Sequence, residues 1–333
     1  MNLIAAVNPR ALRIVLPGGS GLLGQILARH FQERGHHVTV LTRGPYTAPW
    51  QTVHWDGQHP GPWIDYLEGA DVCINLAGRS INCRYDEANR RSIYDSRIKT
   101  TRLLGQVIAG LAEPPQVWLN ASTATIYRHA LDRAMDEATG ELGGNEFITK
   151  RRRAPQTWNL SIQVAKDWET AFFQAHTPRT RKVALRSAIV FSPAHGSAFA
   201  TFSNLVRLGL GGRQGNGRQF VSWIHEADFA RAVEFLIARE DLEGVVNVAA
   251  PNPLPNRAFM AALREAWDVP NGLPLPSLAI EIGALLLRTE SELVLKSRRV
   301  VPGRLLDAGF RFTFPDWPEA AEDLAQQWRH RHD

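Results

Sequence analysis

The chain has 333 residues, of which 44% are hydrophobic and 21% charged, and its formal net charge is +5. This is an ordinary globular composition with enough length for a large core. No apolar run approaches the roughly 18 residues that a membrane-spanning helix needs, and two cysteines do not suggest a disulfide framework. We therefore expect a cytoplasmic protein without a membrane partner.

The positive net charge raises the possibility of nucleic-acid binding, but most basic residues are dispersed along the chain. The exception is the cluster Lys150-Arg151-Arg152-Arg153. We interpret it first as an exposed loop and second as an anion contact. No nucleic-acid partner is predicted.

The opening of the chain predicts a strand over residues 12–16, a glycine loop over 18–24, a helix that ends near Gly35, and a strand over 38–41. This is the order of a Rossmann unit, in which the loop and the helix N-terminus bind a pyrophosphate. Gly19 is expected to make the tight turn, Gly21 to admit the pyrophosphate, and Gly24 to let the helix pack closely. The predicted cofactor-binding residues here are Gly18, Gly19, Ser20, Gly21, Leu22, Leu23 and Gly24.

Further strands are predicted near residues 53–55, 72–76, 116–120 and 182–191, with long helices over 90–111 and 158–173. Strands that alternate with helices predict an α/β fold, a doubly wound parallel sheet with helices on both faces. Residues 10–191 are the expected dinucleotide-binding domain, and the polar segment 128–156 is interpreted as a surface excursion and a candidate lid. Residues 192–333 are the expected smaller, substrate-side region, with a small module over about 285–330, all interleaved as one unit.

The end of the second strand predicts NADP(H) as the cofactor. An NAD site has an acid there to hold the ribose 2′-hydroxyl, whereas this chain has Thr42-Arg43. Arg43 can hold a 2′-phosphate with paired donors, although a strand-end arginine can also be merely solvated.

Several stretches resemble the short-chain dehydrogenase/reductase superfamily in its extended or atypical branch, and most of all the YfcH-like epimerase family. The resemblance covers roughly residues 12–330. It is carried by the loop at 18–24 and by the stretches 38–43, 75–78, 95–101, 208–212, 217–228 and 301–310.

The resemblance implies further contacts beyond the glycine loop. Leu76 and Ala77, followed by Gly78, would contact the cofactor through the main chain, and Arg97 matches an arginine near the nucleotide. Val190 would lie on the nicotinamide side. Arg218 and Gln219 are the predicted substrate contacts, because a glycine-flanked loop can carry them over the pocket.

The catalytic centre departs from the superfamily pattern, which places a Tyr and a Lys four residues apart on one helix face. If Lys166 is that lysine, Ile162 occupies the tyrosine position, and the other register gives Ser161 and Ala165. Neither register supplies a tyrosine.

Other residues remain as candidates for catalysis. Ser122 or Thr123 could hydrogen-bond a substrate oxygen, and Tyr127 is a candidate acid or base that could equally be a packed core residue. Lys166 could still reach the ribose. No metal-binding motif occurs, so no metal is predicted.

Two functions follow as alternatives. One is an NADP(H)-dependent oxidoreductase or epimerase that acts on a carbonyl or alcohol carbon of a small molecule whose identity the sequence does not reveal. The other is a non-catalytic protein that senses NADP(H) or assists assembly. A monomer or a homodimer is expected.

Overall fold

A seven-stranded parallel sheet forms the centre of the computed structural model, which describes residues 10–144, 147–149, 152–153, 156–286 and 291–332. The strand order is β12-β8-β5-β4-β1-β2-β3, and every neighbouring pair is parallel. The strands are β1 (Arg13–Pro17), β2 (His37–Thr42), β3 (Gln51–His54), β4 (Val72–Asn75), β5 (Val117–Thr123), β8 (Arg181–Ser187) and β12 (Gly244–Val248).

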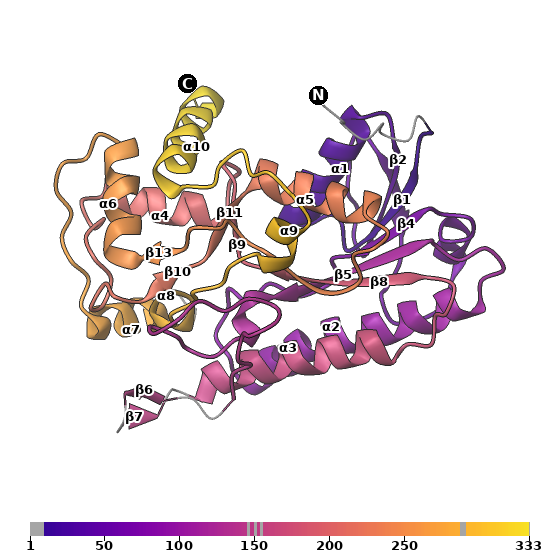
Figure 1. Ribbon diagram of the computed structural model, residues 1–333, viewed down its shortest axis with the longest axis horizontal. Coiled ribbons are helices and arrows are strands. Elements are labelled where there is room, and N and C mark those ends of the chain that lie inside the picture. The colour runs from indigo at the N-terminus through magenta and orange to yellow at the C-terminus, as the bar shows by residue number, and fades with distance from the viewer. Residues whose placement is uncertain (1–9, 145–146, 150–151, 154–155, 287–290, 333) are drawn as a thin grey trace.

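Helices cover both faces of this sheet (Figure 1). One face carries α1 (Leu22–Glu33) and α5 (Glu226–Ala238), and the other carries α2 (Glu87–Gly110) and α3 (Gln156–Gln174). The predicted doubly wound α/β architecture is therefore confirmed.

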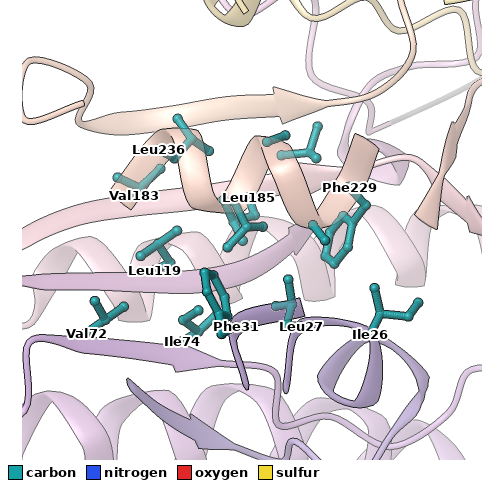
Figure 2. Packing of buried hydrophobic residues seen from close by; sticks show 14 of the residues in the cluster. Ile26, Leu27, Phe31, Val72, Ile74, Leu119, Val183, Leu185, Phe229 and Leu236 are labelled. Carbon is teal, nitrogen blue, oxygen red and sulfur yellow. The ribbon is translucent and has the colours of Figure 1, made fainter. Parts of the chain in front are cut away.

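Alternating residues of the strands divide the core between these two layers. Ile14 and Leu16 pack in the cluster that contains Phe31 of α1, whereas Val15 between them packs with the residues of α2. Figure 2 shows the first layer, with Leu27 and Phe31 of α1 beside Leu119, Leu185 and the α5 residues. Burial of strands on both faces is typical of parallel sheets and explains their nearly continuous apolar sequences.

A smaller region lies beside the carboxyl end of the sheet (Figure 1). It holds two short sheets, β9 (Ile189–Phe191) with β11 (Trp223–His225) and β10 (Phe220–Val221) with β13 (Leu254–Pro255). Its helices are α4 (Ala198–Arg207), α6 (Asn256–Ala266), α7 (Ser277–Leu286), α8 (Glu292–Leu295), α9 (Gly303–Asp307) and α10 (Trp317–His332). Aromatic packing joins α4, α6 and α10, and the ring of Phe259 on α6 stacks on Trp317 of α10 at 4.2 Å. The short helix α9 packs instead on β12 of the main sheet, with Leu305 in the main core.

The predicted strand over 182–191 is two strands. β8 ends at Ser187, and the Ala188 N–H then donates to the Val248 carbonyl at 3.0 Å. The chain continues as β9 in a different sheet, beside β11. β12, from beyond residue 192, completes the main sheet, so chain from both predicted domains builds it. The boundary at 191 stays a prediction.

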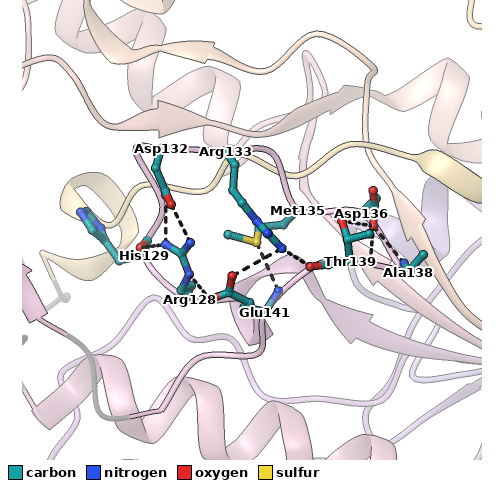
Figure 3. A network of polar contacts seen from close by, with 9 residues as sticks. All are labelled: Arg128, His129, Asp132, Arg133, Met135, Asp136, Ala138, Thr139 and Glu141. Carbon is teal, nitrogen blue, oxygen red and sulfur yellow. Dashed lines mark hydrogen bonds and ion pairs between the residues drawn. The ribbon is translucent and has the colours of Figure 1, made fainter.

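The segment 128–144 is packed rather than loose. Figure 3 shows Arg128 paired with both Asp132 and Glu141, and Arg133 with Glu141. Met135 is fully buried, and its N–H donates to the Arg299 carbonyl at 2.7 Å. None of these residues lines the two cavities described below. They brace the C-terminal region, and the lid expected within 128–156 stays a prediction.

Beyond this segment, β6 (Phe147–Thr149) and β7 (Arg152–Arg153) form a short antiparallel pair. The side chains of the basic cluster 150–153 lie outside the described residues, so the expected anion contact stays a prediction. None of the helices in the described ranges is long and apolar enough to cross a bilayer.

Candidate active site

The glycine loop between β1 and α1 is shaped by close contacts. Gly18 is the residue with the left-handed backbone, at φ +74°, and a Cβ there would meet the Ala77 Cα at 2.6 Å. The tight turn therefore belongs to Gly18, whereas the sequence analysis assigned it to Gly19. Gly19 instead packs on Leu16, and a Cβ on Gly24 would lie 2.2 Å from the Gly19 carbonyl.

Gly21 has a different role, because it faces open space. A Cβ on this residue would meet only the Gly18 carbonyl oxygen, at 3.9 Å. Gly21 is the N-cap of α1, where unpaired N–H groups and the positive end of the helix dipole favour an anion. The loop therefore offers a cradle of the kind that a dinucleotide pyrophosphate requires.

An outer cleft of about 610 Å³ extends from this loop across the carboxyl ends of β1, β2 and β4. Its lining includes most of the predicted cofactor contacts, namely Gly18, Ser20, Gly21, Thr42, Arg43, Leu76, Ala77 and Gly78. Trp55 also lines it while packing edge-on against Trp63 at 5.4 Å, so this residue belongs both to the cleft wall and to the core.

Charge in the outer cleft is arranged around Arg43. Asp56 is hydrogen-bonded by His59 at 2.6 Å, and Asp95 is paired with Lys99 at 2.8 Å. Arg43 is exposed and forms no hydrogen bond or ion pair with any residue that the structure describes. Since Asp56 and Asp95 already have partners, the guanidinium of Arg43 is available to meet a phosphate.

A buried amide network fixes the chain that leaves β4. Asn75 Nδ2 donates to Asn120 Oδ1 at 2.6 Å, while Asn75 Oδ1 accepts from the Ala77 N–H. Thr101 of α2 accepts hydrogen bonds from Asn75 and from Trp168 Nε1 of α3. The network therefore ties both long helices to the strand ends that line the cavities.

An inner pocket of about 210 Å³ shares the lining residues Leu76 and Gly78 with the outer cleft. Hydroxyl groups and charged side chains line it together with apolar residues. The polar members are Tyr85, Arg97, Ser122, Thr123, Thr125, Ser161, Glu292 and Arg298. Glu292 and Arg298 come from the C-terminal region and were not predicted from the sequence.

Arg97 of α2 is a partly buried cation at this pocket. Burial lowers the pKa of its guanidinium to about 10, against the raising influence of Tyr85 and Cys83. Its guanidinium donates to the Ile93 carbonyl at 3.1 Å and lies 5.2 Å from the Trp168 ring. No carboxylate of the described chain pairs with it, so an anionic group of a ligand would find a ready partner.

Ser122 is turned toward a second buried network. Its hydroxyl donates to Glu169 Oε1 at 2.6 Å. Arg186 donates two hydrogen bonds, of 2.8 and 2.7 Å, to the same carboxylate. Arg186 also donates to the Tyr127 hydroxyl, which donates in turn to Asn247 Oδ1.

Tyr127 is therefore held away from the inner pocket. It is 2% exposed and lines neither cavity, and burial raises the pKa of its phenol despite the neighbouring Arg186. The packed-core alternative for Tyr127 agrees with this placement.

The orientation of α3 decides between the two registers. Ser161 and Ala165 line the inner pocket, together with Leu160, Val164 and Trp168. Lys166 lies on another face, where its ammonium group donates to the Gly143 carbonyl at 2.5 Å. The structure does not bring Lys166 to either the cleft or the pocket.

Several other predicted residues also lie elsewhere. Val190 packs in the main core, and Leu22 packs against that core while Leu23 lines the inner pocket. Arg218 is exposed, and Gln219 is buried with its amide donating to the Gln214 carbonyl at 2.8 Å. The structure does not bring Val190, Arg218 or Gln219 to the cavities.

Within the described ranges, no group of three or more His, Cys, Asp or Glu side chains is placed to hold a metal ion. Cys73 and Cys83 are both free thiols.

A phosphate cradle at the switch of a doubly wound sheet, continued by a small polar pocket, defines a Rossmann protein of the dinucleotide-binding class. Comparison with known families gives the same answer. The chain belongs to the NAD-dependent epimerase/dehydratase family, whose model matches residues 14–249, and residues 275–324 match a domain of unknown function, DUF1731. The resemblance inferred from the sequence is confirmed.

Relatives align over almost the full chain. Epimerase family protein SDR39U1 of Bos taurus is 30% identical, covering 94% of this chain and 99% of the relative. Epimerase family protein Mb2239 of Mycobacterium bovis is 33% identical over 90% of this chain and 93% of its own. The crystal structure of human SDR39U1 (isoform 2) with NADPH matches with a TM-score of 0.79 and 28% identity, covering 94% and 99% of the two chains.

Proposed function

We propose that this chain is an NADP(H)-dependent oxidoreductase that reduces or oxidises a small molecule at a carbonyl or alcohol carbon, or epimerises it through a transient ketone. The observation that carries the proposal is the junction of the two cavities at Leu76 and Gly78, where the glycine-loop cleft meets a pocket lined by hydroxyl groups. When bound, a nicotinamide cofactor supplies or accepts the hydride.

The preference for NADP(H) over NAD(H) rests on Arg43. No carboxylate ends β2, and Arg43 faces the outer cleft without a partner in the described chain. A guanidinium there favours a 2′-phosphate through charge-assisted hydrogen bonds. The human relative solved with NADPH supports the same preference.

Hydroxyl groups of the inner pocket would position the substrate oxygen. The Ser122 proton is directed to Glu169, so Ser122 presents lone pairs to the pocket. The Thr125 hydroxyl oxygen accepts a hydrogen bond from Arg298 Nε at 3.2 Å, so the Thr125 hydroxyl proton points away from Arg298. Thr123 Oγ1 accepts from the Thr125 N–H and holds this turn in place. Leu160 and Val164 narrow the pocket and exclude water.

The alternative is a protein that senses NADP(H) and catalyses nothing. The observation that favours it is the helix face at the pocket, where Ser161 and Ala165 occupy the positions of the superfamily's Tyr and Lys. Turnover separates the two proposals.

The test is consumption of NADPH, followed by its absorbance, with a panel of small carbonyl probes such as methylglyoxal, diacetyl and cyclohexanone. The oxidoreductase proposal expects consumption that stops when one mole of NADPH per mole of carbonyl has reacted. Tight binding without consumption contradicts net reduction of these probes and supports the sensor or an epimerase, which returns the hydride and consumes no NADPH. Absence of NADPH binding contradicts every one of these functions.

The assembly and compartment stay predictions. The long helices α2 and α3 lie side by side on one face of the sheet, where a homodimer would form if the chain is not a monomer (Figure 1). We continue to expect the cytoplasm as the compartment and a small molecule as the only partner, without nucleic acid or membrane.

A further inference from the structure

The C-terminal region reaches into the inner pocket with a carboxylate. Glu292, on the short helix α8, is 1% exposed and lines the pocket. The Ser161 hydroxyl donates to Glu292 Oε2 at 2.7 Å, with the Thr157 carbonyl as a weaker partner at 3.4 Å. The contact joins residues 131 positions apart.

Two cations hold this carboxylate in place. Lys296 Nζ lies 3.8 Å and Arg298 Nη2 3.6 Å from Glu292 Oε1. Both are anchored on the same residue of the Rossmann domain, because Lys296 donates to the Thr125 carbonyl and Arg298 to the Thr125 hydroxyl. The cations face Oε1 and leave Oε2 directed at Ser161.

Glu169, the other buried glutamate near the pocket, is in a different situation. Its carboxylate is bound by Arg186 through two short hydrogen bonds, and it does not line the inner pocket. Such a bidentate pair has a structural role. The position of Glu292 on the pocket wall, in contact with the Ser161 hydroxyl, suits a group that exchanges a proton.

Ser161 lies at the position from which the superfamily's tyrosine donates its proton to the substrate. It and Ala165 line the pocket four residues apart on α3, which is the face that carries the Tyr and Lys of the superfamily. A hydroxyl therefore replaces the phenol, and a carboxyl group behind it can restore the proton.

We propose that Glu292 is the proton reservoir of this site and that it acts through Ser161, which is the catalytic hydroxyl. The inference rests on the proposed oxidoreductase function. In reduction, hydride adds to the carbonyl carbon and the C=O π pair moves to oxygen. The step begins with Glu292 protonated, so that its carboxyl donates to Ser161 Oγ and the Ser161 proton is directed at the substrate oxygen. That oxygen takes the Ser161 proton, Ser161 regains one from the Glu292 carboxyl, and the carboxylate is reprotonated by a proton from solvent. One NADPH and one proton are consumed per alcohol formed, and oxidation runs the same steps in reverse.

The first test needs no cofactor. Full-length protein carrying glutamate labelled with ¹³C at the side-chain carboxyl is titrated by NMR, and the resonance lost in Glu292→Gln assigns Glu292. We expect this carboxyl to titrate over the same pH range in which NADPH oxidation by the carbonyl probes falls, as a proton reservoir must. Ser161→Ala should raise its pKa, because the lost hydrogen bond stabilises the charged form. The charged and titratable groups that pair with Glu292 or line its pocket, and therefore shape this titration, are Tyr85, Arg97, Lys296 and Arg298, and His129 lies near the last two.

The second test follows NADPH oxidation by the carbonyl probes in a single turnover. Glu292→Gln and Ser161→Ala should each slow it by about 100-fold, the usual size of a general acid contribution. The double variant should be no slower than either, because the two groups act in one relay. The dissociation constant for NADPH should change less than about twofold. Glu322→Gln, at an exposed glutamate of α10, is the matched control and should react like wild type.

The outcomes separate the two proposals. A Glu292 carboxyl that does not titrate, or a Glu292→Gln protein that reacts at the wild-type rate, overturns the relay and leaves the oxidoreductase standing. The same holds if Tyr85→Phe, at the phenol that also lines this pocket, abolishes the reaction while Glu292→Gln does not. If wild type binds NADPH but reacts with no probe, the proposed function fails and the relay fails with it.

Discussion

Ser161 of α3 and Glu292 of α8 share a hydrogen bond of 2.7 Å that closes the inner pocket between the Rossmann domain and the C-terminal region. Ser161 occupies the position of the superfamily's tyrosine, and Glu292 has no motif around it. Glu292 belongs to the region that matches a domain of unknown function. The same pocket is lined by Leu23 of the glycine loop, so both parts of the chain contribute side chains to it.

The glycine loop gives the first prediction. Gly21→Val should weaken NADPH binding by more than about tenfold, because the side chain would fill the phosphate cradle. The fold should survive, because Gly21 has an ordinary extended backbone that valine can adopt. The change at the N-cap should lower the free energy of unfolding by at most about 1 kcal/mol. Calorimetric titration with NADPH measures the binding, and thermal unfolding measures the stability.

Gly18→Ala is the matched comparison. A left-handed backbone costs an ordinary residue about 1–2 kcal/mol, and here the Cβ also meets the Ala77 backbone at 2.6 Å. We expect a clear fall in the unfolding temperature. A stable Gly18→Ala protein together with an unfolded Gly21→Val protein would contradict the assigned roles.

The buried Arg186 gives the second prediction. Its ion pair with Glu169 is about nine-tenths buried. Burial lowers the pKa of the Arg186 guanidinium, but the hydrogen bonds and charges of Glu169 and Tyr127 outweigh burial and raise it above the usual value. Arg186→Met should destabilise the protein by about 3–5 kcal/mol, because the Glu169 carboxylate loses its partner. Denaturant unfolding provides the measurement. A change below about 1 kcal/mol would show that Glu169 is easily neutralised or solvated.

His129 gives a prediction for pH. Burial, followed by the charges of Lys296, Arg298 and Arg128, lowers its pKa to about 4, and Nδ1 accepts a hydrogen bond from the Ser297 N–H. Because the folded pKa lies below the unfolded value of about 6.5, the unfolded state binds more protons between these values. Stability should therefore be complete above about pH 6.5 and decrease as the pH falls toward 4.

The measurement is the unfolding temperature against pH for wild type and His129→Asn. Asparagine keeps an acceptor for Ser297 but cannot be protonated, so the variant's curve should be flatter over this window. Parallel curves would mean that other groups control the acid sensitivity.

Much of the cofactor site could be predicted because its signals are local. The glycine loop, β2 and Arg43 lie within one short stretch of chain, and a parallel sheet brings consecutive strand ends to one edge. The turn residue was misassigned, because spacing alone does not reveal that Gly18 rather than Gly19 adopts the positive φ.

The catalytic pocket depended on information that the sequence does not hold locally. Choosing Ser161 over Lys166 requires the rotation of α3 about its axis, which is set by its packing on α2 and the sheet. Tyr127 follows β5 closely but turns into the Arg186 network. Glu292 lies on a helix of four residues with no motif around it, and only the folded chain brings it to Ser161.

The central claim is that this pocket system is built around NADP(H), and it depends most directly on Arg43. Charge-assisted hydrogen bonds to a phosphate contribute about 1.5–3 kcal/mol, which corresponds to roughly ten- to a hundredfold in the dissociation constant. Arg43→Ala should weaken NADPH binding by this amount and leave NADH binding nearly unchanged. Arg207→Ala, at an exposed arginine of α4, is the control.

The most direct measurement is calorimetric titration of wild type and Arg43→Ala with NADPH and with NADH. The account predicts that wild type prefers NADPH and that the variant loses most of that preference. Equal affinity of wild type for the two nucleotides would contradict the assignment to NADP(H), and binding of neither would show that the glycine loop has only a structural role.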